Sequence, residues 1–74
     1  MGKHPARDPM ALLLQAATQD EVADWAADIA SKAERQGHPK AARAAWKTAR
    51  RSRANAVMLR ALAGAYGLRD GQRS

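Results

Sequence analysis

The chain has 74 residues, carries a formal net charge of +6 and contains no cysteine. This length corresponds to one small domain, and the lack of thiols excludes disulfides, thiolate metal sites and cysteine nucleophiles. Nineteen residues are alanine and only fifteen are larger apolar residues, so a monomer would have a thin core built from closely packed helices. No apolar run approaches the roughly 18 residues that a membrane-spanning helix needs, and we expect a cytoplasmic protein without a membrane segment.

The charges are unevenly distributed along the chain. Residues 18–36 contain five acidic side chains against two basic ones, whereas residues 38–60 contain seven Lys or Arg and no acid. A surface with such an excess of positive charge attracts polyanions. The richness in alanine and arginine is typical of GC-rich bacterial or phage genomes.

The N-terminal segment, residues 1–7, is polar and aperiodic, which predicts a flexible arm. Asp8 followed by Pro9 is typical of a helix N-cap and the first helical position. A short helix over residues 9–17 is therefore predicted. The residues expected to point inward from it are Leu13 and Leu14.

Thr18 and Glu21 have the spacing of a capping box, in which each side chain accepts a hydrogen bond from the other's backbone amide. This predicts that a second helix covers residues 19–36. Gly37 supplies a left-handed C-terminal cap, and Pro39 suits the first turn of the next helix. A connection this short makes the two helices an antiparallel hairpin. The apolar stripe expected in the core is Val22, Trp25, Ala26, Ile29, Ala30 and Ala33.

A third helix is predicted over residues 39–51, and a fourth over 55–66, with Ser52 or Asn55 as the cap between them. Because this junction has no Gly or Pro, one continuous helix of about 28 residues is the alternative. We favour the break, since one long helix would leave a thin core poorly enclosed. Gly67 ends the last helix. The residues expected to be buried there are Met58, Leu59, Leu62, Ala65 and Tyr66.

These elements predict an all-α domain over residues 8–67, followed by a flexible tail at 68–74. Its architecture is a small bundle of three main helices plus a short N-terminal helix, organised around a central antiparallel helical hairpin.

Large, small and aromatic side chains recur at characteristic positions between residues 23 and 71. The positions are Ile29, Ala30, Gly37, Ala42, Trp46 and Ala49. In this pattern the chain resembles a tetratricopeptide-type hairpin, and Leu62–Tyr66 resembles the opening of a second unit, one residue out of register. Ala33 and Ala54 depart from it, since an aromatic residue and a proline are usual there. The resemblance implies close antiparallel packing and binding of a peptide or protein.

The basic residues of the third helix lie on one stripe, opposite Ala42, Ala45, Trp46 and Ala49. Helix-borne cations at such spacings can contact successive phosphates, which predicts a nucleic-acid-binding or nucleic-acid-associated regulatory protein. The predicted contact residues are Lys40, Arg43, Lys47, Arg50, Arg51 and Arg53, with Arg60 extending the patch.

A non-catalytic adaptor or inhibitor that docks on an acidic protein surface is the alternative. A homodimer would bury the surfaces of Leu12, Leu13 and Met58. His4 and His38 have no carboxylate partners at a metal-ligand spacing, so we expect no enzyme activity, metal or cofactor.

Overall fold

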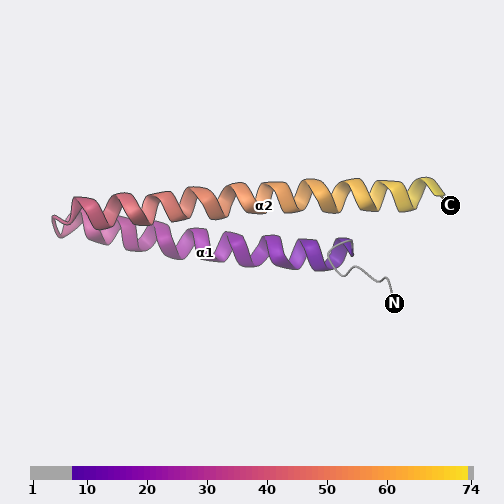
Figure 1. The fold of residues 1–74 in the computed structure, drawn as a ribbon. Coiled ribbons are helices and arrows are strands. Elements are labelled where there is room, and N and C mark those ends of the chain that lie inside the picture. The colour runs from indigo at the N-terminus through magenta and orange to yellow at the C-terminus, as the bar shows by residue number, and fades with distance from the viewer. Residues whose placement is uncertain (1–7, 74) are drawn as a thin grey trace, which may run out of the picture.

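Two long helices joined by a tight turn make up the part of the chain that the computed structural model describes, residues 8–73, with side chains described as far as residue 67. Helix α1 covers Pro9–Arg35 and helix α2 covers Pro39–Arg73. They run antiparallel along most of their length (Figure 1). The predicted all-α class and central antiparallel hairpin are confirmed. The predicted arm, residues 1–7, lies outside the described residues.

The prediction of three main helices plus a short N-terminal helix is wrong, because neither predicted break exists. At the first, the Thr18 hydroxyl donates to the Leu14 carbonyl, 3.1 Å away, within α1 instead of capping a new helix. At the second, Ser52 and Asn55 lie inside α2, which also continues past Gly67. Cap-type residues without a neighbouring Pro or left-handed Gly do not end a helix when both flanks pack on the same partner helix.

The turn between the helices has the chemistry that its sequence predicts. Gly37 has a φ of +78°. The His38 amide donates to the Ala33 carbonyl at 2.8 Å, and the Gly37 amide donates to Glu34 at 3.1 Å. This pair of bonds is the Schellman motif, which satisfies the last carbonyls of α1. Pro39 begins α2 as predicted.

The N-terminus of α1 is capped as predicted. The Asp8 carboxylate accepts a hydrogen bond from the Met10 amide at 3.0 Å, and Pro9 occupies the first helical position, where its missing N–H costs nothing.

The core is a seam of small residues between the helices, and Leu12 is the one large side chain among its buried members. Buried residues recur at intervals of three, four or seven, which is consistent with the heptad spacing of an antiparallel coiled coil. Alanine at these positions lets the two backbones approach closely. The buried residues are Leu12, Ala16, Ala23, Ala26, Ala30 and Ala33 of α1, and Ala42, Ala49, Ser52, Ala56 and Ala63 of α2.

Most of the large residues predicted to be buried are exposed, which corrects the predicted core. Three others are only half-buried: Val22, Leu59 and Tyr66. The protein measures 56 × 24 × 13 Å, so it is one helix thick and has no second layer to cover either broad side. The exposed residues are Leu13, Leu14, Trp25, Ile29, Met58, Leu62 and Ala65.

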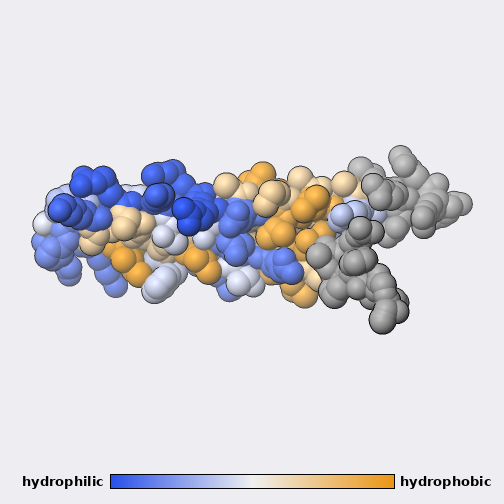
Figure 2. Space-filling model, in the orientation of Figure 1, coloured by the Kyte–Doolittle hydropathy of each residue, from blue (hydrophilic) through white to orange (hydrophobic). Residues whose placement is uncertain are grey.

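The two broad sides of this layer differ in chemistry. On one side, polar side chains of α1 and α2 form hydrogen bonds across the seam. We call this side the ion-pair face, and its members are Asp20, Asp24, Glu34, Trp46, Arg53 and Arg60. Residues on the other side of the seam form the apolar face: Val22, Trp25, Ile29, Met58 and Leu62. In Figure 2, hydrophilic surface covers the start of α2, and hydrophobic surface gathers on both helices farther from the turn.

Because the helices approach closely, a larger side chain in the seam should destabilise the hairpin. Ala30 is fully buried, so Ala30→Leu should force the helices apart and lower the free energy of unfolding by about 1–3 kcal/mol. The exposed Ala54 is the control, and Ala54→Leu should change it by less than about 0.5 kcal/mol. Urea unfolding followed by circular dichroism measures both. An Ala30→Leu variant as stable as Ala54→Leu would contradict the alanine seam.

Two glycines should respond oppositely to alanine. Gly37→Ala should destabilise by about 1–2 kcal/mol, because a left-handed φ strains an L-residue. Gly64 lies inside α2, and an added Cβ there would meet nothing within 4 Å. Gly64→Ala should therefore stabilise by up to about 1 kcal/mol through helix propensity. Thermal unfolding of the two variants checks this, and changes of the same sign would contradict it.

Candidate nucleic-acid interface

The basic residues at the start of α2 share one exposed surface, which we call the basic face. It consists of Lys40, Arg43, Lys47, Arg50 and Arg51, all exposed. Since Ala42 and Ala49 are buried in the seam and Ala45 is half-buried beside them, helical geometry turns these five side chains to the outer side of the layer. The segregation of basic and small residues on opposite sides of this helix, expected from the sequence, is present.

The basic face is linear and free of competing acids. From residue 40 to residue 51 it extends about 17 Å along α2, at 1.5 Å per residue. No acidic residue occurs between Pro39 and Tyr66, and none of the five cations forms an ion pair among the described residues. Their charges are therefore directed to solvent.

Trp46 lies half-buried beside the basic face and bonds across the seam. Its indole Nε1 donates to a Glu34 carboxylate oxygen at 3.0 Å. This carboxylate is the one nearest in sequence to the basic face, and it is held on the ion-pair face.

Arg53 and Arg60, the remaining basic residues of the predicted patch, lie on the ion-pair face. The Arg53 guanidinium is 3.1 Å from Asp24 and 3.9 Å from Asp20. Arg60 pairs with the same Asp20 carboxylate. The structure thus brings five of the six predicted contact residues together and directs Arg53 to acids of α1. These pairs are solvent-exposed, so each contributes only about 0–1 kcal/mol.

The turn adds two cations that the sequence reasoning did not include. Lys32 and Arg35 lie in the last turn of α1, which the hairpin places beside the first turns of α2 (Figure 1). Residues 29–51 together contain seven Lys or Arg and one carboxylate, and we call this part the basic half. Combining the predicted hairpin with the charges at the end of its first helix would have identified these two residues.

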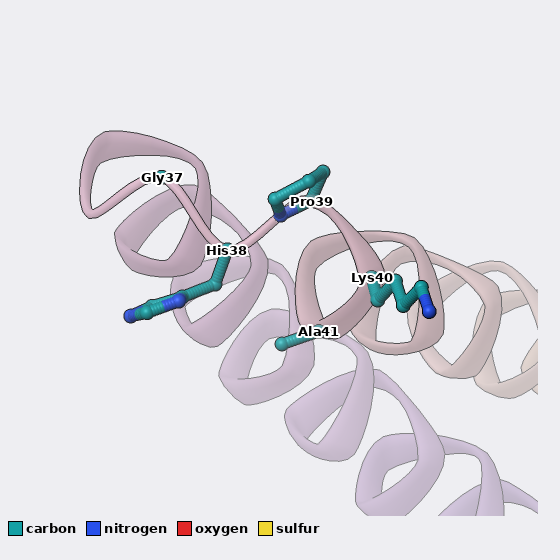
Figure 3. Close-up of a pocket in the computed structure, with 5 residues that line it drawn as sticks. All are labelled: Gly37, His38, Pro39, Lys40 and Ala41. Carbon is teal, nitrogen blue, oxygen red and sulfur yellow. The ribbon is translucent and has the colours of Figure 1, made fainter.

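A shallow hollow at the turn is lined by Gly37, His38, Pro39, Lys40 and Ala41. In Figure 3 the His38 ring and the Lys40 side chain point away from each other. They do not converge on a point where a substrate atom could lie. Across the described part of the chain, no group of three His, Cys, Asp or Glu side chains could hold a metal ion.

The shared carboxylate of Asp20 gives a test of the ion-pair face. Asp20→Asn removes the partner of Arg60 and one partner of Arg53, and should lower the free energy of unfolding by about 1 kcal/mol at low salt. The loss should shrink in about 1 M salt, where exposed pairs are screened. Glu21→Gln is the charge-matched control, because Glu21 is exposed and has no ion pair among the described residues. Equal effects of the two variants on urea unfolding would show that Asp20 contributes no pairing energy.

No protein-family model, curated protein or solved structure matches the chain. Along residues 8–73, neither helix includes a stretch long and apolar enough to cross a membrane.

Proposed function

We propose that this protein is a non-catalytic nucleic-acid-binding or nucleic-acid-associated regulatory protein that contacts phosphates through its basic face. The observation that carries the proposal is the set of five exposed cations on one side of α2, with no ion pair among the described residues. Lys32 and Arg35 extend the same field around the turn.

Binding of this kind draws its free energy from the release of counterions condensed on the phosphates. The basic face contains no Asn or Gln, the side chains that read adenine edges. Arginine can also read guanine, but only when an element enters a groove with several side chains directed at base edges. A straight helix edge with five cations fits contact with the phosphate backbone and little sequence preference.

Docking on an acidic protein surface is the second candidate, and a separate observation favours it. Trp25 is 65% exposed and Met58 is 54% exposed, and large apolar side chains dominate the energetics of protein interfaces. The tetratricopeptide-type resemblance would point the same way. The two candidates differ in the residues that matter: the basic face for nucleic acid, the apolar face for a protein partner.

The deciding experiment is a titration of the protein with mixed-sequence duplex DNA and RNA at about 50 and 200 mM salt. Five phosphate contacts predict a slope of log K against log[salt] near −4.5 for duplex DNA, which is a loss of about 500-fold over that range. The variant Arg43→Gln with Arg50→Gln should bind about 10–100-fold more weakly and reduce the magnitude of the slope by about 2.

The matched control is Arg53→Gln with Arg60→Gln, which removes the same charge from the ion-pair face. It should leave most of the binding in place. No binding at low salt by the folded protein would refute the proposal. Equal losses in both double variants would show that net charge, not the basic face, governs binding.

A further inference from the structure

The apolar face has no covering element in the hairpin. Trp25 and Met58 are more than half exposed, and Ile29 and Leu62 are 38% and 41% exposed. Since the hairpin is a single layer of helices 13 Å thick, it has no second layer that could bury these side chains. Several large apolar side chains exposed on one side of a small protein indicate an interaction surface.

The apolar face lies near the middle of the hairpin. The bonds Glu34–Trp46 and Asp20–Arg60 set the register, in which Trp25 is level with Asn55 on the facing helix. The apolar residues of α1 are at positions 22, 25 and 29, and α1 runs from 9 to 35. The nearest charged residues on the same side of the seam, Lys32 and Arg51, lie toward the turn.

We propose that a second copy of this chain covers the apolar face, forming an antiparallel four-helix bundle. Val22 and Ile29 are seven residues apart, with Trp25 between them. A two-fold axis beside Trp25 and across the helices therefore places Val22 of one copy against Ile29 of the second copy, and brings the two Trp25 rings together. The same operation stacks the α2 helices antiparallel about Asn55, so that Met58 of each copy lies level with Arg51 of the other and the apolar contacts come chiefly from α1.

The charges select the antiparallel orientation. Each basic half carries seven cations and one carboxylate, whereas the rest of the segment 8–67 carries five carboxylates and two cations. An antiparallel pair places the basic half of one copy beside the acidic half of the other. A parallel pair would bring the two basic halves together, and their repulsion disfavours it.

The whole broad side that contains the apolar face is large enough for a stable dimer. The 27 residues of α1 extend about 40 Å, and the layer is 24 Å wide. One broad side therefore offers on the order of 900 Å², comparable with the roughly 800 Å² that each partner buries in a standard interface. Large side chains from both copies would then fill a core that the alanine seam alone does not provide.

Sedimentation equilibrium of the full chain between about 1 and 200 µM tests this dimer. The expected result is a mass of two chains, about twice the 8.0 kDa of one, that falls toward one chain on dilution. Trp25→Gln with Met58→Gln should weaken association at least about 30-fold. Val57→Gln is the control. Val57 is also 65% exposed, but it lies on the side of the seam that carries the ion-pair face, so this variant should leave the mass unchanged. A single-chain mass at 200 µM would overturn the proposal, as would equal effects of the two variants.

A second measurement keeps the test valid if the double variant does not fold. The described residues contain no free cysteine, and the whole chain has none, so single-cysteine variants report on one position each. Asn55→Cys, on the apolar side near the axis, should give a two-chain product with a short bis-maleimide, whereas the outward-facing Ala54→Cys should give little. Equal yields from the two positions would refute the antiparallel arrangement even for a dimeric protein. Neither measurement involves nucleic acid, so its outcome is independent of the proposed function.

Discussion

The close approach of two helix backbones across a seam of alanines is the constraint on which the rest of this structure depends. Ala16, Ala23, Ala30 and Ala56 are fully buried, and a larger side chain at these positions would separate the helices. The seam therefore leaves almost no interior for large residues. Side chains such as Trp25 and Met58 lie on the surface because the hairpin has no other place for them, and the chemistry that they offer is directed outward.

The sequence predicts the local features of the fold well and its long-range pairing less well. The Gly37 cap, the Asp8 N-cap and the Pro39 start follow from backbone chemistry that depends on a few neighbouring residues. The breaks at Thr18 and Ser52 were wrong because cap-type side chains are compatible with a helix interior when tertiary packing continues on both flanks. Of the predicted core, Ala26, Ala30 and Ala33 are buried as expected, but large residues such as Trp25 are exposed, because the seam between the helices accommodates mainly small side chains.

The same distinction applies to the functional surfaces. Exposure of Arg43, Lys47 and Arg50 could be predicted, since alanines on the opposite stripe fix which side of α2 is buried. The position of Arg53 could not, because its partner Asp24 lies on α1 and the register between the helices decides the contact. Lys32 and Arg35 show the converse case: a turn of known geometry brings them to the basic half from another helix.

The Schellman turn determines where along the hairpin the two helices separate most easily. A contact between the helices closes a loop made of the chain between the two contacting residues. This loop is shortest beside Gly37 and longer for each contact farther along the hairpin, so the entropy cost of forming the contact rises with distance from the turn. The free energy needed to separate the helices locally is therefore highest near the turn and lowest where α1 begins. The basic half occupies the end that opens least. Its cations are thus held on the most persistent part of the hairpin, while the distant ends can separate and close again without disturbing their spacing.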